Sequence, residues 1–155
     1  PLVRFIATGA YLGYAPLAPG TAGSLGCALL MWFFVPGVRA SASPLGTAVA
    51  LLSALAFVAL AVWASDVGEK SLGHDSSRIV VDEFAGYVAA VLFLPKTLPV
   101  YIVAFFLFRA MDIVKPFPAR RAEGLPGGLG VVMDDVVAGM YTNLLVRIML
   151  LVRGW

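Results

Sequence analysis

The sequence predicts an all-α integral membrane protein, a helical bundle of four to five long apolar helices joined by short helices and loops. The first observation is composition: 61% of the 155 residues are hydrophobic, 13% are charged, and the mean hydropathy is +0.93. Ordinary globular domains are about 45–50% apolar and about 25% charged. The second observation is that the apolar runs are long and lack the alternation of strands. This favours helices, because a segment in lipid must satisfy its own backbone hydrogen bonds. No shift in composition marks a boundary, so residues 1–155 are expected to form a single domain.

Four long apolar segments are expected to be the main helices. Segment 45–65 carries no charge and is long enough to cross a bilayer, which takes about 20 residues. Segments 79–94, 98–114 and 131–152 are also apolar, but each contains charged residues. The shorter run 24–35 follows the turn-rich stretch APLAPGTAGS, so it is expected to be a short span or a re-entrant helix.

Proline, glycine and polar residues separate these segments. The expected loops are residues 36–44, 66–78, 95–99 and 115–130. Within the last of them, the Pro-Gly-Gly at 126–128 marks a turn rather than a linker, because no second domain follows.

Threading the helices up and down assigns each loop to a side of the membrane. One side receives the basic residues Arg4, Lys70, Arg78, Lys115, Arg120 and Arg121, and the other receives Arg39, Lys96 and Arg153. By the positive-inside rule, the first side is cytoplasmic. The same threading brings all nine acidic residues to that side, which composition alone did not require.

Two stretches of similar sequence, IVVDEFAG and VVMDDVVAGM, each place adjacent carboxylates inside an apolar run. A charge at the centre of a membrane helix costs about 2.5–3.5 kcal/mol on insertion scales, so such residues usually face the bundle interior or a polar cavity. Mg²⁺ takes oxygen ligands from one or two carboxylates together with substrate phosphate. The pattern therefore predicts one cytoplasm-facing carboxylate site for Mg²⁺. Gly86 and Gly139, which follow the two pairs, would let helices approach closely there.

A structural role for these acids is the alternative. They would then be neutralised by nearby cations, for example Arg78 with Asp82 or Asp112 with Lys115, at the spacings that bring side chains together on a helix. The acids outnumber the nearby cations, which favours the metal site. A cation or proton transporter with intramembrane carboxylates is the alternative function, but its acids should be spread through the depth of the bilayer.

Basic and polar residues near the acids are candidates for holding a phosphate. Lys115, Arg120 and Arg121 lie in the loop beside Asp112 and are either phosphate contacts or cations at the lipid headgroups. PLAPGTAGSLG is expected either to offer backbone N–H groups to a phosphate, with Thr21 or Ser24 as helix cap, or to be an ordinary capped turn.

Other classes of chemistry have little support in the sequence. His74, the only histidine, is either a proton-transfer group or a solvated loop residue. Cys27, the only cysteine, lies in an apolar run and is expected to be a packed thiol. There is no basic stripe interleaved with aromatic residues, so no nucleic-acid partner is expected. A Ser-His-Asp triad has no support either, which leaves metal-assisted attack by water.

The ordered motifs ATGAYLGYAPLAPGTAGSLG, HDSSRIVVDEFAG, FRAMDIVKPFPARR and GGLGVVMDDVVAGMY resemble the phosphatidylglycerophosphatase A family over nearly the whole chain. This resemblance implies an all-helical fold and a Mg²⁺-dependent lipid phosphatase. The implied substrate is phosphatidylglycerophosphate, whose terminal phosphate would be removed to give phosphatidylglycerol in phospholipid biosynthesis. It also implies a multi-pass protein of the bacterial inner membrane with its site facing the cytoplasm. Membrane lipids are the other expected partners, and the oligomeric state is left open.

The candidate residues follow from the motifs and the nearby charges. The expected catalytic residues are Asp82, Glu83, Asp112, Asp134 and Asp135. The expected metal ligands are Glu69, Asp75, Asp82, Glu83, Asp134 and Asp135. The expected substrate-binding residues are Lys115, Arg78, Arg120, Thr21 and His74, of which Lys115 in DIVKP is the foremost phosphate contact. In this scheme a carboxylate or a metal-bound hydroxide activates water, and Lys115 with an arginine offsets the charge of the leaving alkoxide.

Overall fold

The structure is a computed structural model that describes residues 1–35, 43–73 and 76–153. The described residues form helices and no strands, as expected for an all-α protein. The helices are α1 (Leu2–Ala7), the 3-10 helix η1 (Leu12–Tyr14), α2 (Pro19–Phe34), α3 (Pro44–Leu72), α4 (Val81–Val91), α5 (Leu98–Val114), α6 (Ala119–Ala122) and α7 (Gly128–Arg153).

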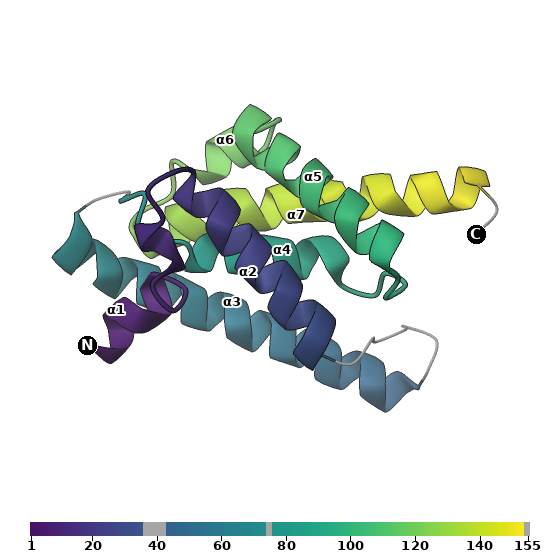
Figure 1. Ribbon diagram of the computed structural model, residues 1–155, viewed down its shortest axis with the longest axis horizontal. Helices are drawn as coiled ribbons and strands as arrows, with labels where there is room; N and C mark the ends of the chain where they lie inside the picture. The colour runs from purple at the N-terminus through teal and green to yellow at the C-terminus, as the bar shows by residue number, and fades with distance from the viewer. Residues whose placement is uncertain (36–42, 74–75, 154–155) are drawn as a thin grey trace.

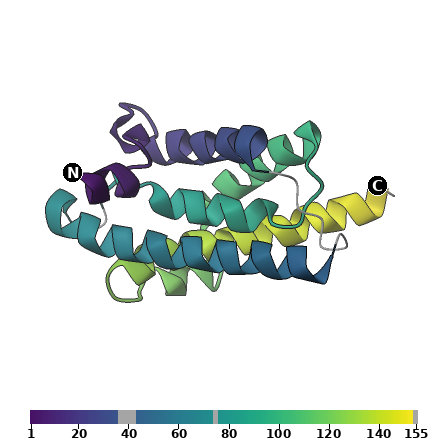
Figure 2. The same ribbon diagram turned by 90° about the horizontal axis from the view of Figure 1, so that it is seen from below.

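The short helix α4 is the centre of the bundle. It packs against α2, α3, α5 and α7, and Figure 2 shows it between α2 and α3. Its residues enter both hydrophobic clusters of the core: Tyr87, Ala90 and Val91 belong to one, and Val81 and Ala85 to the other. Because these four helices all pack on α4, the direction in which α4 runs determines the position of its first turn relative to them.

Two glycines allow α4 and α7 to approach each other closely. A methyl group at Gly139 would overlap the carbonyl oxygen of Gly86. A methyl group at Gly86 would lie 2.6 Å from the ring of Phe108 and 2.7 Å from the carbonyl oxygen of Asp135. These distances are shorter than a normal carbon contact, so only glycine fits. The expectation that both glycines permit close helix packing at the level of the carboxylates is confirmed.

The long helices run alternately in opposite directions. In Figure 1, α3 ends and α4 and α7 begin toward the left of the view, and α5 runs toward the same end and finishes above them. We call this the site end. Threading the sequence up and down predicted this arrangement, which brings residues far apart in the sequence together.

Some helix boundaries differ from the predicted ones. α5 matches residues 98–114, whereas α3 continues to Leu72 instead of ending at residue 65, so Asp66 and Glu69 lie on a helix rather than in a loop. The expected loop 115–130 contains α6 and the start of α7. Most of the expected loop 36–44 lies outside the described residues.

α4 is shorter than the predicted segment 79–94, and a residue of α7 explains where it ends. The amide of Asn143 donates hydrogen bonds to the carbonyl oxygens of Ala89, Ala90 and Leu92, at 3.3, 3.0 and 2.9 Å. These carbonyls lie at the end of α4, where no further turn satisfies them.

Two helices of the described chain are long and apolar enough to cross a membrane by length and composition, namely α3 over Pro44–Leu72 and α7 over Gly128–Val152. Only 6% of the most apolar window of α3 is buried inside the protein. α4 has 11 residues and α5 has 17, below the roughly 20 residues that a full crossing takes. The structure thus offers two helices of spanning length in place of the expected four to five.

Candidate active site

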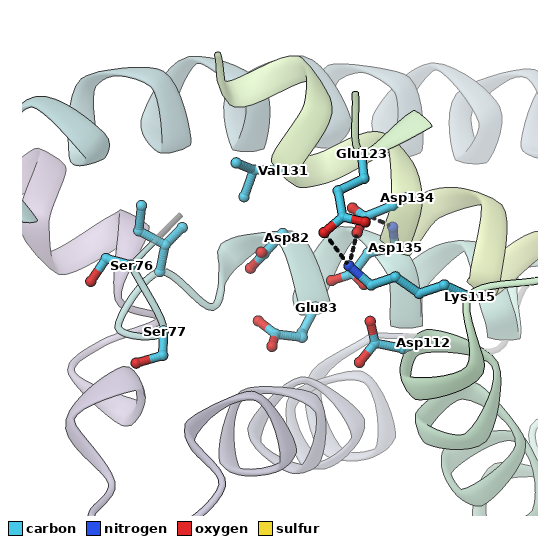
Figure 3. Close-up of a pocket in the computed structure, with 11 residues that line it drawn as sticks. Ser76, Ser77, Asp82, Glu83, Asp112, Lys115, Glu123, Val131, Asp134 and Asp135 are labelled. Atoms are coloured by element: carbon cyan, nitrogen blue, oxygen red, sulfur yellow. Dashed lines mark hydrogen bonds and ion pairs between the residues drawn. The ribbon is translucent and has the colours of Figure 1, made fainter. Parts of the chain in front are cut away.

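A polar pocket of about 320 Å³ opens at the site end between α4, α5 and α7. Figure 3 shows carboxylates from all three helices pointing toward one another in this pocket. Its lining residues are Ser76, Ser77, Ile79, Asp82, Glu83, Asp112, Lys115, Glu123, Val131, Asp134 and Asp135.

Local structure positions the two acidic pairs. Asp82 and Glu83 lie in the first turn of α4, where the helix dipole favours negative charge. The N–H group of Val80 donates to the carbonyl oxygen of Ala7 at 2.9 Å, which holds the start of α4 against α1. Asp134 and Asp135 lie in the second turn of α7 and are 6% and 3% exposed.

Three of these carboxylates form a compact set of oxygen donors. One oxygen each from Asp82, Glu83 and Asp135 lies within 4.8 Å of the other two. Oδ1 of Asp82 and Oε2 of Glu83 are buried and have no hydrogen-bond partner among the described residues. A buried polar atom without a partner is costly, and a hard cation such as Mg²⁺ takes such oxygens as ligands. The residues present therefore fit a divalent cation.

The electrostatics of α4 agree with this donor set. Burial raises the pKa of Asp82, and the negative charge of Glu83 raises it further. Burial also raises the pKa of Glu83, although its hydrogen bond with Asp82 and the positive charge of Arg109 act in the opposite direction. Burial is the main cause of both shifts, and positive charge nearby would oppose it by favouring the ionised carboxylates. A bound cation would supply such charge.

Lys115 supplies the main cation of the pocket. Its Nζ lies 2.7 Å from Oδ2 of Asp134 and 3.2 Å from Oε1 of Glu123. Burial lowers the pKa of Lys115, but the two carboxylates outweigh this effect and raise it overall, so the side chain stays charged at neutral pH. Lys115 ends α5 in the left-handed region, with φ 47°, just before Pro116. This conformation costs a non-glycine residue about 1–3 kcal/mol.

Arg109 joins three elements beside the pocket. Its Nη1 lies 2.9 Å from Oδ2 of Asp112 and 4.0 Å from Oε1 of Glu83, and donates to the hydroxyl of Ser24 at 3.2 Å. A methyl group at Gly20 would overlap Oε1 of Glu83, so a glycine there lets α2 reach the acidic residues. Arg109 thus balances the charge of two carboxylates and ties α2 to α5.

The comparisons with known proteins agree with the motifs. The family model described as Phosphatidylglycerophosphatase A matches residues 5–150. The chain belongs to this family. A protein of Escherichia coli named phosphatidylglycerophosphatase A is 33% identical over 143 residues, which cover 88% of this chain and 77% of the relative. A protein of the same name from Haemophilus influenzae is 35% identical over 148 residues, covering 93% and 86%.

A further relative carries a different name. A protein of Bacteroides thetaiotaomicron, named a putative phosphatidylinositol-3-phosphatase, is 40% identical over 146 residues, covering 92% of this chain and 90% of the relative. No solved structure matches the chain.

In this phosphatidylglycerophosphatase A family member, the structure brings together part of the predicted site. The predicted residues that line the pocket are Asp82, Glu83, Asp112, Lys115, Asp134 and Asp135. Glu69, Thr21, Arg78 and Arg120 are not among its lining residues. Arg78 instead lies over the ring of Tyr14, with its guanidinium carbon 5.3 Å from the ring centre. His74 and Asp75 lie outside the described residues.

The partners expected for the charge pairs and for the helix cap are wrong. Asp112 pairs with Arg109, three residues earlier on the same helix, whereas Lys115 pairs with Asp134 of α7 and with Glu123. Ala18 precedes α2 without a side-chain cap, and the hydroxyl of Ser24 donates to the carbonyl oxygen of Gly20 at 2.8 Å. For Lys115, tertiary contacts outweigh the local pairing that the spacing suggested.

Sequence reasoning missed Arg109 as a site residue, together with Glu123, Ser76 and Ser77. For Arg109 a signal existed, because it stands three residues before Asp112 on the same helix. Glu123 had no such signal, since its position depends on how the chain folds back after α5.

Proposed function

We propose that this protein is a Mg²⁺-dependent lipid phosphatase that removes the terminal phosphate of phosphatidylglycerophosphate and leaves phosphatidylglycerol. The observation that carries the proposal is the convergence of six carboxylates with one lysine in a single pocket. Membership of the family and the names of the E. coli and H. influenzae relatives support the substrate.

The cation would be held by Asp82, Glu83 and Asp135, the three carboxylates whose oxygens lie together. When bound, Mg²⁺ would act as a Lewis acid that polarises the phosphoryl group and offsets its negative charge. Two of these carboxylates come from the rigid start of α4 and one from α7, so the close packing of these helices keeps the donor atoms in place.

The other residues of the pocket would handle the phosphate and the proton. Lys115 is a donor for an oxygen of the terminal phosphate. Asp134 would accept a proton from the attacking water, whose oxygen forms the new bond to phosphorus. As the bond between phosphorus and the glycerol oxygen breaks, Asp134 gives this proton to the glycerol oxygen. The balance is one water consumed, one inorganic phosphate and one lipid alcohol released.

Arg109 would hold Glu83 and Asp112 in their orientations. It lies within ion-pair distance of both carboxylates and contacts α2 through Ser24. We assign it a positioning role. The roles expected for Glu69, Arg78, Arg120 and Thr21 are not retained in this mechanism, because they do not line the pocket.

We place the protein in the bacterial inner membrane with its site end at the cytoplasmic face. α3 and α7 have the length and composition to cross, and Lys70, Lys115, Arg120 and Arg121 lie toward the site end, as the positive-inside rule requires of a cytoplasmic side. The active site would then lie where the headgroup of a lipid enters. A transporter is not favoured, because the pocket carboxylates gather at one end of the bundle instead of following its length.

The test is phosphate release by the purified protein from lipid in mixed micelles. We expect release from phosphatidylglycerophosphate with Mg²⁺ and none with a chelator. Phosphatidic acid and phosphatidylinositol 3-phosphate serve as comparison substrates, the latter because of the name of the B. thetaiotaomicron relative. Faster release from phosphatidylinositol 3-phosphate would change the proposed substrate and keep the chemistry. Full activity in the chelator would contradict the metal-dependent mechanism.

A further inference from the structure

A second cavity of about 460 Å³ lies outside the acidic pocket, between α2 and α5. Its walls carry large apolar side chains that are exposed in this structure, including Leu25, Leu29 and Phe33 on α2 and Ile102 and Phe106 on α5. Tyr87 of α4 also lines it. We call this cavity the α2–α5 groove.

The chemistry of the groove suits a hydrocarbon chain. The polar atom of Tyr87 is used internally, since its hydroxyl donates to the carbonyl oxygen of Tyr101 at 3.1 Å. Trp32 and Tyr101, which also line the groove, pack edge to face with ring centres 5.6 Å apart. The described residues that line it include no charged residue. A sugar, nucleotide or free phosphate would therefore find no charged partner among these lining residues.

The groove and the acidic pocket follow one another along α5, and α2 contacts α5 between them. On α5, Phe105 of the groove stands four residues before Arg109, and Asp112 of the pocket follows three residues later, so all three share a helix face. On α2, Ala28 of the groove stands four residues after Ser24. The contact of Ser24 with Arg109 therefore lies between the apolar groove and the carboxylates.

The dimensions agree with a lipid that stands upright in one leaflet. At 1.5 Å per residue, Asp112 and Phe106 are about 9 Å apart along α5, and Phe106 and Leu98 about 12 Å. A leaflet offers a headgroup layer of about 5–8 Å above about 15 Å of hydrocarbon. A lipid with its phosphate at the carboxylates would thus have its headgroup beside Arg109 and Ser24 and an acyl chain in the groove.

We propose that the α2–α5 groove binds an acyl chain of the lipid whose phosphate enters the acidic pocket. The inference rests on the proposed function, and it adds the part of the protein that distinguishes a membrane lipid from a water-soluble phosphomonoester. The occupant is an anionic amphiphile: its anionic end faces Lys115 and Arg109, and its apolar end faces the groove.

Two variants test the groove by kinetics. Ala28→Trp fills it, and Phe106→Ser makes one exposed wall polar without removing a buried side chain. Leu30→Trp is the matched control, because Leu30 is an exposed residue of α2 that does not line the groove. We expect both groove variants to lower kcat/KM for long-chain phosphatidylglycerophosphate by about tenfold or more, which corresponds to about 1.4 kcal/mol. For a dihexanoyl analogue, the groove variants and the control should match the unmodified protein.

Photolabelling tests the position of the chain directly. Phosphatidylglycerophosphate with a diazirine in one acyl chain is added to the protein in phosphatidylcholine nanodiscs, and labelled peptides are identified by mass spectrometry. We expect label on α2 and α5 that unlabelled substrate competes away and excess phosphatidylcholine does not. Label spread evenly over α3 and α7 would overturn the inference, and so would cross-linking of two copies through the groove, because a second copy would then be the occupant.

The two proposals fail in different ways. If the unmodified protein releases no phosphate, the proposed function fails, and the competed label still decides whether the groove holds a lipid chain. If phosphate is released while the groove variants behave like Leu30→Trp and the label is not competed, the groove inference alone fails.

Discussion

At the scale of residues, the adjacent carboxylates of VVMDDVVAGM have different environments. Asp134 accepts a hydrogen bond from Lys115 at 2.7 Å and another from the backbone N–H of Asp135 at 2.9 Å. Asp135 instead joins Asp82 and Glu83 in the set of oxygen donors. Neighbouring helical residues point about 100° apart, so one pair can serve two tasks. In the proposed mechanism, this difference assigns metal binding to Asp135 and proton transfer to Asp134.

Substituting each aspartate by its neutral isostere should distinguish these tasks. We expect Asp135→Asn to weaken Mg²⁺ binding by about tenfold or more, because it removes one charged ligand. Asp134→Asn should change Mg²⁺ affinity by less than about threefold but lower kcat by about 100-fold or more, the usual contribution of a general base. Titration calorimetry measures the affinity and phosphate release measures kcat. Equal loss of metal affinity in both variants would contradict the division of roles.

Lys115 should contribute chiefly to substrate binding. In Lys115→Met the phosphate loses a charged donor, and Asp134 and Glu123 lose their shared cation. A charged hydrogen bond is worth about 1.5–3 kcal/mol, so we expect kcat/KM to fall by about 10–100-fold with Mg²⁺ affinity retained. Lys70→Met is the control, because Lys70 is an exposed partner of Asp66 on α3. An unchanged KM in Lys115→Met would show that another residue holds the phosphate.

At the scale of elements, the packing of α4 on α7 controls the geometry of the site. Because Gly86 and Gly139 face each other at short distance, the helices cannot separate without moving the carboxylates at their site ends. The end of α4 also depends on α7, since Asn143 of α7 satisfies the last carbonyls of α4.

Gly139→Ala should destabilise the protein by about 1–3 kcal/mol, the usual cost of overpacking. Its methyl group would overlap the backbone of α4, which has no flexible end to move. Gly124→Ala is the control, because a methyl group there lies 3.4 Å from its closest neighbour, the carbonyl oxygen of Arg121. Thermal unfolding in detergent measures both. Equal midpoints for the two variants would show that the close approach is not required.

The boundaries that the sequence mispredicted have a common cause. Residues 66–72 look like a polar loop, yet they continue α3, with Lys70 and Asp66 paired at 3.5 Å one turn apart and Gly68 packed on Ala7. A polar stretch at the end of an apolar helix is compatible with both loop and helix. Its composition does not show whether it packs against another part of the chain, as Gly68 does against Ala7. The exact bounds of α5 were predictable, since Pro99 near its start and Pro116 beyond its end limit the helix from both sides.

At the scale of the whole molecule, the exposed surface is unusually apolar. Leu52 and Leu55 in the middle of α3 are 66% and 64% exposed, and Leu151 near the end of α7 is 78% exposed. Contiguous apolar surface of this kind marks contact with lipid or protein. Lipid contact agrees with two helices of spanning length and with a site at one end of the bundle.

Cysteine labelling in intact cells should establish the orientation. In a Cys27→Ser background, Leu45→Cys and Ser71→Cys place thiols at opposite ends of α3. We expect a membrane-impermeant maleimide to label Leu45→Cys in intact cells and Ser71→Cys only after permeabilisation. Leu55→Cys, in the middle of α3, should stay unlabelled because hydrocarbon surrounds it. Rapid labelling of Leu55→Cys would contradict a membrane-spanning α3.

The sequence by itself determined the helical class, the order and direction of the long helices, and the gathering of acidic residues at one end. These features depend on the length of each apolar run, on the positions of the charged residues, and on successive helices running in opposite directions. Each of these can be read from the sequence without knowing which side chains touch. Only the tertiary structure decided which carboxylates meet, because helix rotation sets side-chain direction and packing at Gly86 and Gly139 sets helix rotation. It therefore joined Asp135 to Asp82 and Glu83, left Glu69 out of the pocket, and gave Arg109 and Lys115 partners on other helices.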